Sequence, residues 1–249
     1  MSSGSSADHL PTVEADQIGW LTEADMIEVD RVMVEDLRIG LIQMMENAGR
    51  NLASLIVSRY RPETVTVLAG SGGNGGGGLV AARHLANHGV TVAVVLSRLP
   101  GALTGVPRHQ LDILERMAVP IDDEPREASV VVDALIGYSL RGAPRGRAAE
   151  LMHWLAAQSG SVVSLDTPSG LDVTTGDGPG AVVRADATLT LAMPKIGLRS
   201  AATVGELFVA DISVPPSVYP PLQVGPPPPF HLGSIIRCRR ERDRTGTGS

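Results

Sequence analysis

The sequence predicts a Rossmann-like three-layer α/β/α fold, with a doubly wound, mostly parallel sheet that is preceded by N-terminal helices. Short β-branched runs alternate with helical segments, which is the element order of such folds. A glycine-rich stretch follows the first of these runs, at residues 70–78. Aromatic residues make up only 3% of the chain, so aliphatic side chains must fill the core, as in strands that are buried on both faces.

The predicted helices before the sheet have clear local signals. Thr22 is suited to cap a helix that runs through Glu23 to Met33, because its hydroxyl can accept from the free N–H groups of the first turn. An apolar stripe with a period of 3.6 residues predicts a second helix, from Leu41 to Ile56. Its methionines, Met44 and Met45, indicate core packing more than an interface. A homodimer formed through these helices is nevertheless a reasonable expectation.

The alternating part of the chain predicts strands and helices in turn. Expected strands cover residues 65–70, 91–97, 129–135, 161–166, 186–192 and 206–211, and helices cover 79–89, 110–117 and 147–158. In a sheet of this kind, the ligand site lies beyond the carboxyl ends of the strands.

The two ends of the chain differ in composition from the middle. Residues 1–18 are small and polar, and residues 215–249 combine a Pro-rich run with the basic stretch RCRRERDRTGTGS. Both segments are predicted to be disordered tails that flank one Rossmann domain at residues 19–214. The basic stretch could contact an acidic partner, but a solvated end is the simpler interpretation.

Charge and cysteine content exclude several classes of protein. The formal net charge of -6 argues against a nucleic-acid or membrane binder and favours a small-molecule ligand. One cysteine, Cys238, provides neither a disulfide framework nor a Cys-based zinc site. No apolar stretch approaches the roughly 20 residues of a membrane span, and the N-terminus lacks the features of a signal peptide. A cytoplasmic protein is therefore expected.

The glycine-rich stretch lies between the first strand and its helix. Residues 70–78 read GSGGNGGGG, and such a run can expose backbone N–H groups to a phosphate at the start of a helix. The alternative is a merely flexible loop. The stretch is not the strict dinucleotide fingerprint, and it has no Walker lysine.

Charged side chains follow three of the predicted strands. Asp133 and Asp166 end adjacent strands, so their carboxylates should converge and could hold a cation or share acid/base work. Either aspartate alone could equally be a helix cap or a turn residue. Lys195, the only lysine of the chain, follows the strand at 186–192; a functional need for an ammonium group and chance in an arginine-rich composition are both open interpretations. Ser169 lacks the Gly-x-Ser-x-Gly elbow of a serine hydrolase.

Four ordered motifs within residues 20–214 resemble the NAD(P)H-hydrate epimerase family, also known as the YjeF N-terminal domain. They are MENAG at 45–49, the glycine-rich segment at 70–80, DALIGYSLRG at 133–142 and DTPSGLD at 166–172; AMPK at 192–195 and VADI at 209–212 match later elements. The resemblance implies that the substrate is hydrated NADH or NADPH, whose nicotinamide ring carries a hydroxyl at C6. The family interconverts its R and S epimers, so that a separate ATP- or ADP-dependent dehydratase can repair the S form.

The resemblance also implies roles for individual residues. Asn74, Asp133 and Ser169 would ligate a potassium ion. Asp166 would be catalytic: our hypothesis is that it relays a proton to and from the C6 hydroxyl, which leaves and re-adds on the other face of a flattened cationic ring. The implied substrate-binding residues are Gly73, Asn74, Gly75, Gly76, Gly77, Gly137, Tyr138, Ser139, Leu140, Arg141, Gly142, Ala143, Asp166 and Lys195.

The glycine-rich segment departs from the family pattern. Where the family has N-N-G-G-D, residues 73–77 read GNGGG, so the first asparagine and the aspartate are missing. A non-catalytic nucleotide-ligand-binding or scaffold protein on the same fold is therefore the alternative function. An NAD(P)-dependent dehydrogenase fits less well, because the ribose-binding acidic residue about 20 positions on is not evident. The sequence leaves the choice between NADHX and NADPHX open.

Overall fold

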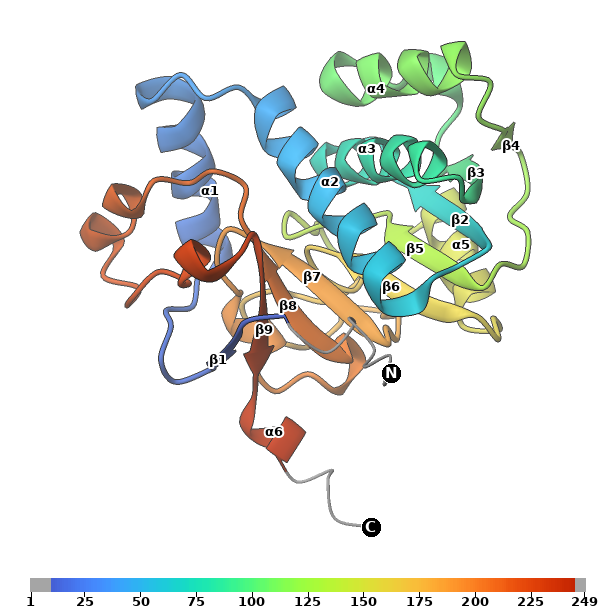
Figure 1. Cartoon of the computed structure of the whole chain (residues 1–249). Coiled ribbons are helices and arrows are strands. Elements are labelled where there is room, and N and C mark those ends of the chain that lie inside the picture. Colours follow the sequence, from blue (N-terminus) through green and yellow to red (C-terminus); the bar gives the residue numbers. More distant parts are fainter. Residues whose placement is uncertain (1–9, 245–249) are drawn as a thin grey trace, which may run out of the picture.

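A computed structural model describes residues 10–244, which form a nine-stranded, mostly parallel sheet with helices on both faces (Figure 1). The strand order is β1-β9-β8-β7-β6-β5-β2-β3-β4, and only the β8–β9 pair is antiparallel. The strands are β1 (Thr12–Glu14), β2 (Thr64–Ala69), β3 (Thr91–Leu96), β4 (Ile121–Asp122), β5 (Val130–Ala134), β6 (Ser161–Leu165), β7 (Ala187–Leu191), β8 (Glu206–Ala210) and β9 (Ile235–Arg239). The helices are α1 (Glu23–Arg31), α2 (Leu41–Tyr60), α3 (Gly73–Asn87), α4 (Gly105–Arg116), α5 (Gly146–Leu155) and α6 (Glu241–Arg244).

The order of the central strands confirms the predicted fold class. From β2 the chain winds outward through β3 and β4, then returns to the other side of β2 to add β5, β6 and β7. The neighbouring carboxyl ends of β2 and β5 therefore mark a topological switch point, where doubly wound sheets bind ligands. Each strand expected from the sequence lies within two residues of its observed position.

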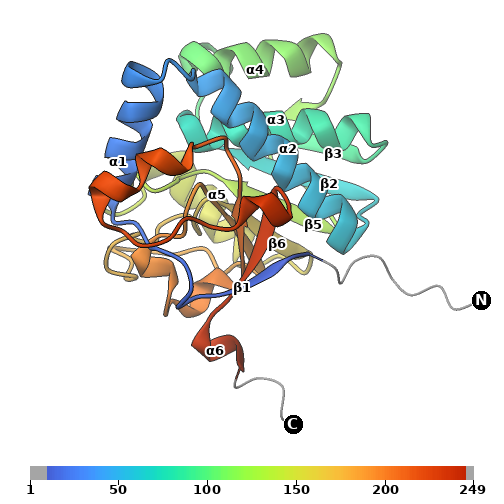
Figure 2. The ribbon, with the colours of Figure 1, turned by 60° about the vertical axis from the view of Figure 1, so that its left-hand side comes forward.

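Alternating side chains of the strands separate two layers of core. Val65 and Val67 of β2 pack in one cluster with α2 and α3, whereas Leu68 packs with Leu151 of α5 in another. Figures 1 and 2 show α2 and α3 together on one face of the sheet, with α5 on the other. Burial of each such aliphatic side chain stabilises the fold by about 1.5–3 kcal/mol, so both faces of the sheet carry substantial cores.

The N-terminal helices follow their sequence signals closely. Thr22 caps α1 as predicted: its Oγ1 accepts from the Asp25 backbone N–H at 3.2 Å, and the Asp25 carboxylate accepts from the Thr22 N–H at 2.8 Å. The helix continues as a π-helix, Val32–Asp36. Met44 and Met45 of α2 are buried, and Met44 packs in one core cluster with Met26 and Val29 of α1.

The glycine-rich segment differs from the prediction, because most of it is helical. Helix α3 begins at Gly73, so the glycines expected in a turn form its first two turns. Glycine normally destabilises a helix interior by about 1 kcal/mol, but here the backbone packs too closely for side chains. A Cβ on Gly75 would lie 1.8 Å from the carbonyl oxygen of Gly70, and one on Gly78 would lie 2.5 Å from Cβ of Ala134. Helix α3 can therefore pack directly against the ends of β2 and β5.

The predicted disordered tails are wrong over residues 10–18 and 215–244, which are ordered. Strand β1 pairs with β9, and β9 pairs with β8. The Pro-rich run forms short 3-10 turns that bury Val218 and Tyr219 against α1 and α2. Composition suggested disorder because this segment is rich in proline and arginine, and the strand Ile235–Arg239 has only three buried apolar side chains, Ile235, Ile236 and Cys238. Residues 1–9 and 245–249 of the predicted tails lie outside the described residues.

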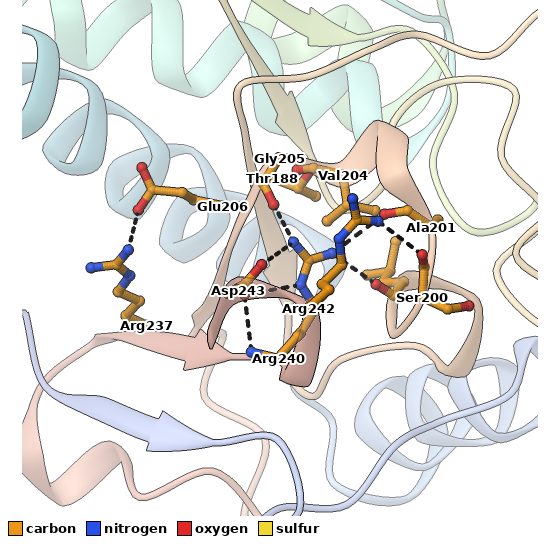
Figure 3. A network of polar contacts seen from close by, with 11 residues as sticks. Thr188, Ser200, Ala201, Val204, Gly205, Glu206, Arg237, Arg240, Arg242 and Asp243 are labelled. Carbon is orange, nitrogen blue, oxygen red and sulfur yellow. Dashed lines mark hydrogen bonds and ion pairs between the residues drawn. The ribbon is translucent and has the colours of Figure 1, made fainter. Parts of the chain in front are cut away.

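Arg240 anchors the basic end of this segment (Figure 3). Its guanidinium is buried and donates to the carbonyl oxygens of Leu198, at 3.1 Å, and Gly205. The same group forms an ion pair with Asp243 at 3.0 Å. A positive charge in the basic stretch thus joins the C-terminal segment to the loops beneath β7 and β8, and the domain extends well beyond residue 214. No helix within residues 10–244 is long and apolar enough to span a bilayer.

Candidate active site

A cavity of about 680 Å³ opens at the carboxyl ends of the strands, where the fold class predicts a ligand site. Its walls come from α1, α2, the first turns of α3 and α4, and the loops that follow β2, β3, β5 and β6. Apolar side chains such as Met44 and Leu135 share the lining with a few polar groups. A cavity of this size, mostly apolar with a few polar groups, is typical of a small-molecule site.

Only some of the predicted substrate-binding residues line this cavity. Those that do are Gly73, Asn74, Gly77, Gly137, Tyr138, Ser139 and Asp166. Those that do not are Gly75, Gly76, Leu140, Arg141, Gly142, Ala143 and Lys195. Leu140 and Gly142 line a separate shallow hollow beside Asp172, and Arg141 forms an exposed ion pair with Glu23 at 2.5 Å. Of the glycine-rich segment, only Ser71, Gly72, Gly73, Asn74 and Gly77 therefore face the cavity.

Asp166 lies at the end of β6 and is held from two sides. Its Oδ1 is 2.5 Å from Nζ of Lys195, and its Oδ2 accepts from the backbone N–H of Tyr138 at 3.0 Å. The Asp166 backbone has φ +66°, in the left-handed region that non-glycine residues seldom adopt. This strained backbone directs the carboxylate from the end of the sheet into the cavity.

Lys195 is fully buried beneath Asp166. Besides the ion pair, its ammonium donates to Oγ1 of Thr190 at 3.2 Å and to the carbonyl oxygen of Leu191 at 2.9 Å. The single lysine thus has three acceptors for its three N–H donors. The sequence placed Asp166 and Lys195 in one site, and the structure shows a direct ion pair between them.

Asp133 lies below the cavity and does not line it. Its carboxylate accepts from Ser169 Oγ at 2.5 Å, Ser164 Oγ at 2.8 Å, and the backbone N–H groups of Ser169 and Leu135 at 2.8 and 3.3 Å. Burial raises the pKa of Asp133, and these hydrogen bonds oppose the rise only in part. Within residues 10–244 no basic side chain pairs with it. The site thus contains a buried carboxyl group that lacks a protein cation.

The side chain of Asn74 is also buried, but unlike the Asp133 carboxylate it has no hydrogen-bond partner. Both Oδ1 and Nδ2 are buried and form no hydrogen bond within the described part of the chain. Gly137 lies against it, and a Cβ at Gly137 would be 3.2 Å from both Asn74 Cβ and Asp166 Oδ2. An unpartnered amide oxygen, a buried carboxylate and the Ser169 hydroxyl are hard oxygen donors, so these residues fit a potassium ion. No cluster of three His, Cys, Asp or Glu that could hold a metal occurs in residues 10–244.

The structure also reveals cavity residues that the sequence did not indicate. Asp30 of α1 lines the cavity, and its carboxylate accepts from the Tyr138 hydroxyl at 2.5 Å. Burial raises the pKa of Asp30, while the Tyr138 hydrogen bond and the charge of Lys195 lower it. In the sequence, Asp30 is indistinguishable from other acidic residues of its amphipathic helix.

Two further polar residues, Ser97 and Arg98, follow β3 and line the opposite end of the cavity. Arg98 has no hydrogen-bond or ion-pair partner among residues 10–244. Its position directly after a buried strand was the available signal, as it was for Asp133 and Asp166.

Comparison with known proteins gives consistent similarities. The sequence profile described as YjeF-related protein N-terminus matches residues 41–197. An NAD(P)H-hydrate epimerase of Dehalogenimonas lykanthroporepellens is 50% identical over 216 residues, which cover 84% of this chain and 87% of that protein. The bifunctional NAD(P)H-hydrate repair enzyme Nnr of Hyperthermus butylicus is 39% identical over 218 residues, 83% of this chain but only 40% of that enzyme. Among solved structures, the yeast protein ynu0 has a TM-score of 0.76 at 23% identity and covers 88% of this chain and 99% of its own, which supports the fold.

Proposed function

Because the chain belongs to the family of YjeF-related protein N-termini, we infer that it is an isomerase, an NAD(P)H-hydrate epimerase that interconverts the R and S forms of hydrated NAD(P)H. The observation that carries this inference best is the placement of Asp166. Its carboxylate lines the cavity at the end of β6 and is held by Lys195 and by the Tyr138 N–H. A scaffold protein would not need a buried ion pair whose carboxylate lines a ligand cavity. This arrangement favours the enzyme over the non-catalytic alternative.

The cavity suggests how the dinucleotide is oriented. Asp166 marks the β6 side, so the nicotinamide ring would lie there, with C6 next to the carboxylate. The start of α3 at Gly73 lines the cavity, and the N–H groups of this first helical turn would bind the diphosphate. The adenosine would then extend towards Ser97 and Arg98 after β3, as the switch-point geometry requires.

In the proposed reaction, Asp166 exchanges a proton with the hydroxyl on C6. Departure of that hydroxyl leaves a cationic ring, which the Asp166 carboxylate stabilises because it lies in a site of low dielectric. Lys195 and the Tyr138 N–H fix the direction of the carboxylate, so that proton transfer needs little rearrangement.

A potassium ion held by Asn74, Asp133 and Ser169 would supply a fixed positive charge at the base of the cavity. Its main effect would be to compensate the buried carboxylate of Asp133 and to hold the loop that includes Gly137. The proposed pathway partner is a dehydratase that consumes the S epimer, because the related Nnr enzyme of Hyperthermus butylicus is named as a bifunctional repair enzyme.

The test is an epimerisation assay with the R epimer of NADHX or NADPHX, potassium buffer, and excess S-specific dehydratase with ATP. The wild type should consume the R epimer faster than it epimerises spontaneously. The Asp166→Asn variant should lose at least about 100-fold in kcat, because a positioned acid/base group contributes that much. The matched control is Asp112→Asn, an aspartate of α4 that pairs with Arg116 and does not line the cavity. Full activity in Asp166→Asn would refute the role of Asp166, and an inactive wild type that still binds NADP+ would favour the non-catalytic alternative.

A further inference from the structure

We propose that Asp30 is a second proton-transfer group of the same active site, which serves the face of the nicotinamide ring that Asp166 does not reach. This inference rests on the proposed function and names a residue from a different wall of the cavity. Asp30 lies on α1, before the region matched by the family profile, whereas Asp166 follows β6.

The stereochemistry of the reaction requires two such groups. Epimerisation at C6 removes a hydroxyl from one face of the ring and adds water to the other. The C6–O bond breaks with its electron pair, and the oxygen takes a proton from a carboxyl group and leaves as water. The N1 lone pair meanwhile forms an N1=C6 double bond. A second water then attacks C6 from the opposite face, its proton passes to a carboxylate there, and the π electrons return to N1. One proton is supplied on one face and one is removed on the other, and a carboxylate fixed by Lys195 can reach only one face.

Tyr138 sets the separation of the two aspartates. Its backbone N–H donates to Asp166 at 3.0 Å, while its hydroxyl, at the far end of the same residue, donates to Asp30 at 2.5 Å. Both carboxylates line the same cavity, together with Tyr138 itself. The two groups therefore face one space from different directions, with the length of a tyrosine between their points of attachment.

The surroundings of the two aspartates differ, and the difference suits proton transfer on the two faces of the ring. Asp166 forms a buried ion pair with the Lys195 ammonium, so a cation contacts this carboxyl group directly. Asp30 is bonded by the neutral Tyr138 hydroxyl, and burial raises its pKa; the charges that face it are Lys195 and Asp166, while Glu23 of its own helix pairs with Arg141. Two carboxyl groups whose environments differ in this manner can act as an acid and a base at the same pH. Together they hold one exchangeable proton: Asp30 gives it to the departing hydroxyl and Asp166 accepts one from the attacking water, so one complete epimerisation shifts the proton from Asp30 to Asp166, and the reverse reaction returns it.

A purely structural role for Asp30 must be distinguished from this one, because its bond to Tyr138 also ties α1 to the loop after β5. Asp30→Asn is the informative change, since an amide oxygen still accepts from the Tyr138 hydroxyl while proton transfer is lost. Asp36→Asn is the matched control, an aspartate that follows α1 and forms an exposed ion pair with Arg31. Tyr138→Phe removes the hydroxyl alone.

The experiment measures kcat and kcat/KM from both epimers across a wide pH range, with NADP+ titration as a separate probe of the cavity. Wild-type kcat/KM should fall as the pH rises through the raised pKa of Asp30, because its protonated form is then lost. Asp30→Asn should lose at least about 100-fold in kcat and should lose this alkaline limb, with NADP+ affinity unchanged. Asp36→Asn should match the wild type, and Tyr138→Phe should shift the alkaline limb.

Three results would overturn the proposal. In the first, Asp30→Asn keeps most of its activity while Asp166→Asn is inactive. This result would exclude Asp30 from proton transfer but leave the proposed function intact. In the second, the loss of kcat is accompanied by an equal loss of NADP+ affinity, which assigns Asp30 a structural role. In the third, the wild type epimerises neither hydrate, which overturns the proposed function and this inference together.

Discussion

Replacing Lys195 by methionine tests whether the buried ion pair with Asp166 is needed for the fold as well as for the site. Lys195 has no exposed surface, and its Nζ lies 2.5 Å from the Asp166 carboxylate, which is itself almost fully buried. Methionine keeps most of the aliphatic stem but removes the charge. Breaking a buried pair in this way leaves an uncompensated carboxylate, and we expect the free energy of unfolding to fall by about 3–5 kcal/mol.

The assay is urea-induced unfolding followed by circular dichroism, applied to a double-mutant cycle. Lys195→Met combined with Asp166→Asn should recover a large part of the loss, with a coupling energy of about 2 kcal/mol, because both charges are then absent. Arg116→Met is the control: it breaks the exposed pair with Asp112 and should leave the free energy of unfolding nearly unchanged. A loss in Lys195→Met below about 1 kcal/mol, or no recovery in the double variant, would refute the reasoning.

Two further predictions concern the ends of the cavity. Arg98→Ala should reduce kcat/KM for NADPHX by about 10- to 100-fold and hardly affect that for NADHX, because an unpaired arginine after β3 can bond the adenosine 2′-phosphate. The control is Arg50→Ala, which changes an exposed arginine of α2, and equal losses for both substrates in Arg98→Ala would contradict this role. Potassium chloride should raise the Tm of the wild type above its value in choline chloride of equal concentration, since a bound ion stabilises the native state, and Asn74→Ala should abolish this difference. An equal Tm of the wild type in both salts would exclude the potassium site.

Much of the fold was predictable because it depends on local patterns. Strands such as Val130–Ala134 are nearly continuous apolar runs. Asp133 and Asp166, at the ends of two of these strands, indicate the position of the site from the sequence alone. The helical start of α3 was not predictable, because glycine favours loops locally, and only close packing against Gly70 and Ala134 explains its presence in a helix.

The candidate site was only partly predictable for a related reason. The position of Asp166 after a strand and the family resemblance for Lys195 assigned both residues to one site, but their separation could not be predicted. Asp30 carries no sequence signal, because its relation to Tyr138 depends on how α1 packs over the sheet. The strand Ile235–Arg239 was hidden in a Pro-rich and basic composition that is typical of tails, and its partner strand β1 comes from the other end of the described chain.

The pairing of β1 with β9 has a consequence for the order in which the molecule can be assembled on the ribosome. Glu14 and Arg239, which join the two strands, are separated by 225 positions. Strand β1 leaves the ribosome early but has no partner until Ile235–Arg239 has been synthesised, so a nascent chain carries an unpaired strand while the central parallel strands form. Closing so long a loop is slow, and an exposed strand edge invites association with other chains. This edge of the sheet is thus completed late in synthesis, and shortening the chain before residue 235 would leave β1 without its partner.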